Sequence, residues 1–135
     1  MSEVTNLWPD FTIEKVRTPK TVLKEQAALL GERTRNLILG EVVSDKVPLK
    51  SGKEVISEEL YLVVPSLGNY RYRLVELYHE PALVYPLFEG LYLSEGMKSN
   101  GINDENDLTK YLSSVFTNTK TKTIIQSLLA QAMES

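Results

Sequence analysis

The residues of this sequence that are best suited to chemistry lie close together near the middle of the chain. They are two tyrosines that alternate with two arginines, followed by the only histidine: Tyr70, Arg71, Tyr72, Arg73 and His79. Guanidinium groups bind anions, tyrosine rings stack and donate hydrogen bonds, and a histidine can transfer a proton near neutral pH. These residue types predict a binding surface, either for another macromolecule or for a small anionic ligand.

Residues 60–79 are predicted to form a β-hairpin, because two runs of alternating side chains flank the turn-forming residues 65–69. Successive side chains of a strand point to opposite faces of the sheet. On the second run, one predicted face consists of Tyr70, Tyr72, Leu74, Glu76 and Tyr78. The other consists of Arg71, Arg73, Val75, Leu77 and His79. Neither face is purely apolar or purely polar, so the hairpin is predicted to carry the working surface.

A catalytic role for His79 needs a partner within hydrogen-bond reach. Its neighbours Glu76 and Glu80 fall on the opposite face of a regular strand, which favours a structural or solvent-exposed histidine. Ser66 lacks the preceding glycine of a nucleophile elbow, and the sequence contains no glycine-rich phosphate-binding motif. The acidic residues 103–107 lack the glycine and the glutamate of a calcium-binding EF-hand loop. We therefore predict no catalytic residue, no cofactor and no metal site, and leave enzymatic activity undecided.

The alternation of arginine and tyrosine on one strand is also typical of surfaces that stack bases and hold phosphates. The alternative is an outer sheet face on which Glu58 or Glu59 of the preceding strand pairs with the arginines. The chain has 15 basic and 18 acidic residues, a net charge of -3 and a pI near 5.2. Nucleic-acid binding needs clustered positive charge, so this composition predicts that nucleic acid is not the partner.

The composition is that of one globular domain and is compatible with a reducing compartment. The chain has 135 residues, of which 42% are hydrophobic and 24% charged, and it has no cysteine. The N-terminus lacks the basic and apolar regions of a signal peptide, and no apolar run approaches the roughly 20 residues that span a bilayer. The sequence therefore predicts a soluble cytoplasmic protein without a membrane partner.

The first predicted helix follows residues 1–10, which are either a flexible arm or lead into a short added strand at Phe11 and Ile13. Thr18 is the predicted N-cap, Pro19 occupies the first helical position, and Gly31 is the predicted C-cap. The helix spacing places five residues on the core side: Val22, Leu23, Ala27, Leu29 and Leu30.

The next part of the chain predicts strands at residues 36–44, 54–64, 70–79 and 83–88. Gly40 predicts a bulge in the first strand, and residues 45–53 form a long connection. Pro86 predicts an edge position for the strand 83–88, because proline cannot donate to a ladder. Residues 91–93 either continue that strand or form a fifth, and residues 94–103 are a loop with its turn at Asn100 and Gly101.

Two helices are predicted at the C-terminus. Asn103 or Asp104 caps the first, which has five apolar residues at helical spacing: Leu108, Tyr111, Leu112, Val115 and Phe116. The last runs from about residue 120 to 133 and has one apolar stripe, formed by Ile124, Ile125, Leu128, Leu129 and Met133. This helix has no charged residue from position 123 to 130, so we expect cover on more than one side. A second copy of the chain would provide it, which predicts a homodimer.

The order of helix, strands and two helices predicts a single α+β domain with an antiparallel sheet of about four to five strands. The function that follows is a non-catalytic protein-interaction or regulatory module, which uses the exposed sheet face or the C-terminal helices. The alternative is a small-molecule site or enzyme beside the hairpin, in which Arg71 or Arg73 holds an anion and His79 or a glutamate moves a proton.

Overall fold

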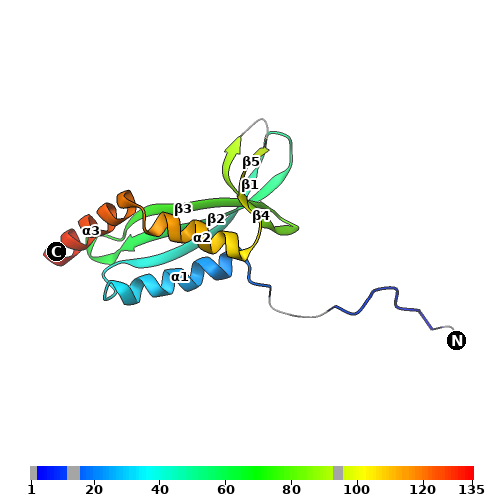
Figure 1. Cartoon of the computed structure of the whole chain (residues 1–135), viewed down its shortest axis with the longest axis horizontal. Helices are drawn as coiled ribbons and strands as arrows, with labels where there is room; N and C mark the ends of the chain where they lie inside the picture. The colour runs from blue at the N-terminus through cyan, green and yellow to red at the C-terminus, as the bar shows by residue number, and fades with distance from the viewer. Residues whose placement is uncertain (1–2, 12–15, 93–95) are drawn as a thin grey trace.

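The computed structural model describes residues 3–11, 16–92 and 96–135, with the backbone alone at residues 91–100. A five-stranded antiparallel sheet follows one helix and precedes two (Figure 1). The elements are α1 (Pro19–Arg33), β1 (Leu39–Pro48), β2 (Glu54–Val64), β3 (Tyr70–Glu80), β4 (Leu83–Tyr92), β5 (Gly96–Ile102), α2 (Glu105–Phe116) and α3 (Thr119–Glu134). A 3-10 turn, η1 (Pro65–Leu67), joins β2 to β3. The strands lie in the sheet in chain order, and the predicted α+β class is confirmed.

Helix α1 begins as predicted and ends later than predicted. The Thr18 side chain accepts a hydrogen bond from the N–H of Thr21, and Pro19 is the first helical residue. Gly31 is not the C-cap but a buried residue of the last turn; the helix ends at Arg33, and the N–H of Thr34 donates to carbonyls of that turn. The predicted core residue Leu29 is instead 47% exposed.

Strand β1 is unbroken at Gly40, so the predicted bulge there is wrong. Its pairing with β2 runs without a shift from Leu39 opposite Val63 to Pro48 opposite Glu54. A Cβ atom at Gly40 would lie 2.5 Å from the Cα and Cβ atoms of Ala27, so glycine is needed because α1 approaches the strand closely. The strand also extends through residues 45–48, which were expected to belong to the connection.

Replacement of Gly40 by alanine tests this close approach. The new methyl group would push α1 away from β1, and overpacking of this kind costs about 1–3 kcal/mol. Gly31→Ala is the matched control, since its methyl group would meet only the side chains of Asn36 and Leu39, and alanine favours the helix by about 0.5–1 kcal/mol. Urea unfolding should show a loss for Gly40→Ala alone. Equal effects of the two substitutions would contradict the explanation.

Strand β3 contains a bulge at Leu74 that reverses its predicted alternation. Tyr61 pairs with Arg73 and Leu60 pairs with Val75, so Leu74 is an extra residue. The side chains on the helix-covered face are therefore Tyr70, Tyr72, Leu74, Val75, Leu77 and His79. Those on the opposite face, which none of the described helices covers and which we call the open face, are Arg71, Arg73, Glu76 and Tyr78, of which Tyr78 is buried. The predicted grouping of His79 with the arginines is wrong.

Strands β4 and β5 differ from the sequence prediction. Strand β4 pairs with both β3 and β5, so Pro86 is not on an edge; it lies where the register with β3 shifts, and no regular ladder needs its missing N–H there.

Residues 96–102, expected as loop, form β5. Gly101, with φ of 81°, lies within a register shift of this strand and not in a turn between elements. Residues 91 and 92 belong to β4, and residue 93 lies outside the described residues.

The three helices cover one face of the sheet, where the core is. Helix α1 packs on β1, α2 packs on β5, and α3 packs on η1 at the end of the central hairpin. Asp104 and Asn118 cap α2 and α3 with their side chains. In α3 the predicted stripe is buried only in part, because Leu128 and Ala132 face the core while Met133 is exposed. Residues 3–11 form no regular element and run away from the body; residue 13, part of the added strand considered above, is not described (Figure 1).

Candidate functional site

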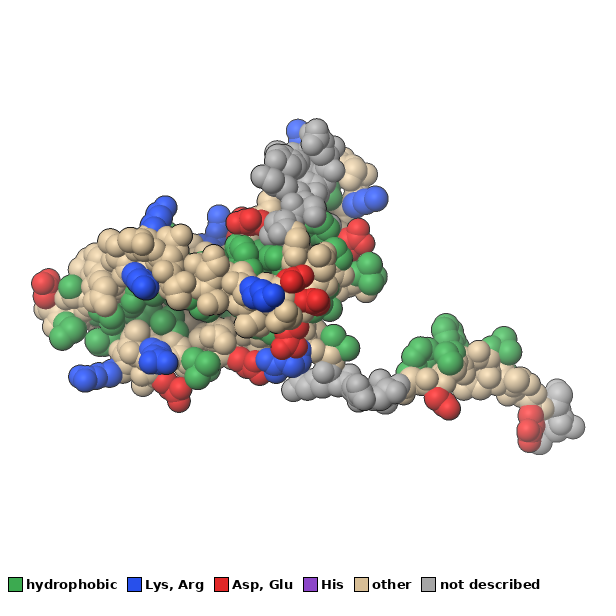
Figure 2. Space-filling view, in the orientation of Figure 1, with side chains coloured by type: hydrophobic (Ala, Val, Ile, Leu, Met, Phe, Trp, Pro, Cys, Tyr) green, Lys and Arg blue, Asp and Glu red, His purple; other side chains and the backbone are tan. Residues whose placement is uncertain are grey.

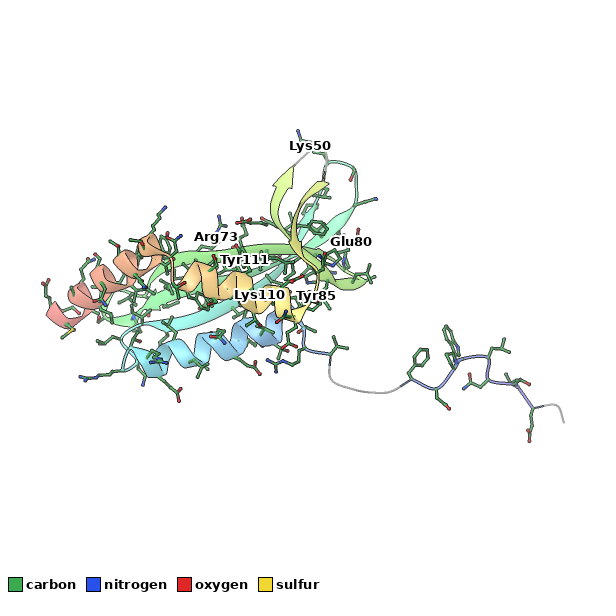
Figure 3. The ribbon with its side chains drawn as sticks, in the orientation of Figure 1. Lys50, Arg73, Glu80, Tyr85, Lys110 and Tyr111 are labelled. Atoms are coloured by element: carbon green, nitrogen blue, oxygen red, sulfur yellow. The ribbon has the colours of Figure 1, made fainter. Side chains whose placement is uncertain are left out.

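The five candidate residues do not meet in one site. Arg71 and Arg73 lie on the open face of the sheet, where Figure 3 shows Arg73 on the side of β3 away from α1. His79 is buried in the helix-covered layer. Tyr70 and Tyr72 also face the helices, but they lie at the η1 end of β3, opposite Val64 and Leu62. Three separate environments follow.

On the open face, both arginines are paired with carboxylates. Arg73 lies 3.2 Å from the carboxylate of Glu59 and 2.8 Å from that of Glu76. Arg71 pairs with Glu41 of β1, and its guanidinium carbon lies 4.1 Å from the ring centroid of Tyr61. The predicted pairing of Glu59 with an arginine is confirmed. Because carboxylates already match both positive charges, this face offers little attraction to an added anion.

Tyr61 belongs to the same network. Its hydroxyl donates to a carboxylate oxygen of Glu59 at 2.9 Å. The hydrogen bond to Glu59, burial and the negative charge of that carboxylate raise the pKa of Tyr61 above its ordinary value. The hydroxyl therefore keeps its proton and holds Glu59 in position beside Arg73. The open face is a set of mutually satisfied polar groups.

His79 forms a buried polar cluster with Glu58 and Ser44. The Nε2 atom of His79 lies 3.4 Å from Oε1 of Glu58, and Nδ1 lies 2.8 Å from the carbonyl oxygen of Glu80. The hydroxyl of Ser44 donates to the other oxygen of Glu58 at 2.6 Å. Glu58 therefore pairs with the histidine and not with an arginine. It is only 4% exposed, and His79 is 5% exposed.

This arrangement holds a proton on His79 and does not activate a nucleophile. In a serine triad the imidazole lies between the hydroxyl and the carboxylate, whereas here the carboxylate lies between the other two groups. Both ring nitrogens face acceptors, which only the doubly protonated ring can satisfy. Burial lowers the pKa of His79, but the hydrogen bonds to Glu58 and Glu80 and the charge of Glu58 outweigh it and raise the pKa overall.

The raised pKa of His79 predicts that stability falls as the pH rises. The contribution of the charged histidine is fully present below the pKa of unfolded histidine, about 6.5, and is lost as the pH passes the higher folded value. The free energy of unfolding of the wild type should therefore fall as the pH rises above about 6.5, relative to that of His79→Gln, which has no titrating ring. Urea unfolding at a series of pH values measures both. Parallel pH profiles would contradict this role.

Tyr70 and Tyr72 line a groove at the η1 end of β3. It has a volume of about 560 Å³, and its other residues come from η1 and α3: Leu67, Thr123, Ile124, Ser127, Leu128 and Gln131. Tyr72 also packs against the core beside Leu62 and Leu74. The tyrosines therefore help to hold α3 to the sheet, and only Tyr70 is largely exposed.

A larger groove lies between α1 and the junction of α2 with α3. It has a volume of about 720 Å³. Its floor consists of three leucines of the central hairpin, Leu60, Leu62 and Leu74. Its walls are formed by the later half of α1, by the end of α2 with the following Thr117, and by Ile125 of α3. Figure 2 shows hydrophobic side chains gathered in the gap between α1 and α3. We call this site the helix groove.

Of the groove leucines, the sequence predicted Leu29 and Leu30 as core residues and made no such prediction for the three leucines of the floor. Leu29 and Leu30 follow the apolar spacing of α1, and both lie in the groove wall, where Leu29 is 47% exposed. The polar residues of the lining, Gln26, Glu32, Arg33 and Thr117, carry no pattern that marks a site. The one sequence signal was the charge-free stretch of α3, which includes Ile125.

Comparison with family models, with curated proteins and with solved structures found no match to this chain. Among the residues that the structure describes, no group of three or more histidine, aspartate or glutamate side chains is placed to hold a metal ion. No described helix is both long enough and apolar enough to cross a bilayer.

Proposed function

We propose that this protein is a non-catalytic module that binds an apolar segment of a protein partner in the helix groove. The observation that carries this proposal is an apolar groove of about 720 Å³ that opens beside the exposed side chain of Leu29. Apolar surface that becomes covered contributes about 25 cal/mol for each Å² removed from water. A partner that fills the groove therefore gains affinity without any change in the fold.

The form of the helix groove suits a short peptide segment. Its α1 wall runs from Gln26 to Arg33, a rise of about 10 Å, which gives room for two or three large side chains. The groove combines polar residues in its lining with an apolar floor of leucines. Protein–protein interfaces have the same combination of an apolar centre and a polar rim. The arrangement of two helical walls over a sheet floor favours recognition by apolar anchors.

Other features support a protein partner over a substrate or nucleic acid. The lining of the helix groove contains no histidine, serine or tyrosine, and its two ionisable residues, Glu32 and Arg33, are adjacent and exposed. Arg71 and Arg73 are neutralised by carboxylates, and the chain has a net charge of -3. A cytoplasmic location, suggested by the lack of cysteine, stays a prediction.

A peptide library displayed on phage tests the proposal. Selection against the full chain should enrich sequences with two or three aromatic or aliphatic anchors. Leu29→Glu should lower their affinity at least tenfold, because it places a charge at the mouth of the groove. Met133→Glu is the matched control, since Met133 is exposed on α3 outside the groove and its replacement should have no effect. Failure to enrich such peptides, or equal binding to both variants, would overturn the proposal.

A second function, binding of a small apolar ligand with an anionic group, is favoured by the size of the helix groove and by Arg33 in its lining. The volume of about 720 Å³ falls within the range of about 300–1,000 Å³ that is usual for small-molecule sites. This is the small-molecule alternative beside the hairpin, with Arg33 in place of Arg71 or Arg73.

Long-chain fatty acids test this second function. They should raise the thermal midpoint of the wild type, whereas their methyl esters, which lack the charge, should raise it less. Arg33→Gln should reduce the shift caused by the acids and leave that of the esters unchanged. Lys24→Gln, on the same helix but outside the groove lining, is the control. If neither the acids nor the esters change the thermal midpoint, the second function is wrong.

A further inference from the structure

We propose that the segment bound in the helix groove is the N-terminal arm, residues 3–11, of a second copy of this chain. Two copies would then exchange arms in a symmetric dimer. This inference rests on the proposed function of the groove and names its partner. The arm is the most apolar exposed segment described, and it contacts none of the core clusters.

The arm has the side chains that an apolar groove binds well. Leu7, Trp8 and Phe11 are 89%, 75% and 69% exposed, and Val4 is also fully open to solvent. The rings of Trp8 and Phe11 lie beside each other, with centroids 6.4 Å apart. Figure 2 shows these hydrophobic groups as a separate cluster away from the body. Exposed groups of large apolar side chains mark interaction surfaces, and tryptophan is among the residues that contribute most to binding.

The chain is anchored just before α1, at the end of that helix that lies far from the helix groove. The side chain of Arg17 pairs with Glu25 of α1 and Glu105 of α2, and the hydroxyl of Tyr85 donates to the carbonyl of Arg17 at 3.0 Å. These contacts hold the chain where α1 and α2 begin, as the position of Tyr85 in Figure 3 indicates. The helix groove lies at the later half of α1, whereas the arm joins the body before the start of that helix (Figure 1).

An exchange buries twice the area that one arm would bury. Two aromatic rings from each arm bury about 150–250 Å² apiece, so two exchanged arms bury about 600–1,000 Å² of aromatic surface, to which the groove walls add a smaller area. The arm has two acidic residues, Glu3 and Asp10, and the groove lining has one acidic and one basic residue, Glu32 and Arg33, so the match rests on the apolar side chains. An exchange of two arms also closes the assembly at a dimer, because each groove is filled.

Trp8 reports on this contact directly, since it is the only tryptophan of the chain. Its fluorescence in the full-length protein should shift to shorter wavelength as the protein concentration rises, and light scattering should show the mass doubling over the same range. Leu29→Glu and Phe11→Ser should each move both transitions to at least tenfold higher concentration. Met133→Glu, on α3 outside the groove lining, is the matched control for Leu29→Glu and should leave both transitions unchanged. Phe11→Ser lies outside the folded body, so it tests the contact even if Leu29→Glu unfolds.

Each other outcome overturns the inference in a recognisable way. A short-wavelength emission that does not depend on concentration, in a monomer, would mean that the arm binds its own groove. A dimer in which Trp8 stays exposed would mean that another surface, such as α3, joins the copies. If Trp8 stays exposed in a monomer at all concentrations while displayed peptides still bind in a Leu29-dependent manner, the arm is not the ligand but the proposed function stands. If those peptides also fail to bind, both the inference about the arm and the proposed function are wrong.

Discussion

The bulge at Leu74 decides what each face of this sheet carries. Without the extra residue, strand β3 would keep Val75, Leu77 and His79 on the same face as Arg71 and Arg73. With it, the apolar residues on both sides of the bulge face the helices, and Leu74 packs against both core clusters. The arginines stay on the open face and pair with glutamates of β1, β2 and β3. One irregular residue thus separates an apolar layer from a polar one.

The helix groove follows from where the helices are fixed. Helix α1 is held close to the edge strand β1, because Gly40 allows its backbone to approach Ala27. Helix α2 packs on the other edge strand, β5. The starts of the two helices are joined through Arg17, but the central strands β2 and β3 lie between their ends with Leu60 and Leu62 as the floor. The groove therefore opens between the later half of α1 and the junction of α2 with α3, over Leu60 and Leu62, which are themselves buried.

The sequence predicted elements well where local chemistry decides the structure. Thr18 and Pro19 marked the start of α1, and the bounds of β2 were predicted to the residue. The prediction from the sequence was wrong where the structure depends on a residue that is distant in the sequence. Glycine is needed at position 40 because Ala27 of α1 lies close to it. Proline is accepted at position 86 because the register with β3 shifts there. Residues 96–102 form a strand because β4 pairs with them. A bulge such as that at Leu74 has no local signal, so the faces of β3 were predicted correctly only as far as the bulge.

The candidate site was less predictable because it depends on those same long-range features. The types of the hairpin residues were informative, since Glu59 does pair with Arg73. The sequence did not identify Glu58 as the partner of His79. The two residues are far apart in the sequence and meet only because β2 pairs with β3 in this register. The apolar arm was visible in the sequence as Leu7, Trp8 and Phe11, but neither its exposure nor a groove of matching chemistry could be predicted from their spacing.

Contact with water has different energetic costs for the two parts of the helix-covered layer, the buried ionic cluster and the leucines of the helix groove. Glu58 lies two residues before Leu60 on β2, so the buried ionic cluster directly adjoins the groove floor. A buried charge that loses its partner costs about 3–5 kcal/mol, so the protein must keep Glu58 and His79 permanently covered and paired. The apolar side chains that line the helix groove carry no such penalty, because water in contact with them costs only about 25 cal/mol for each exposed Å². The groove is therefore the part of the layer at which a partner can bind and leave without disturbing the fold.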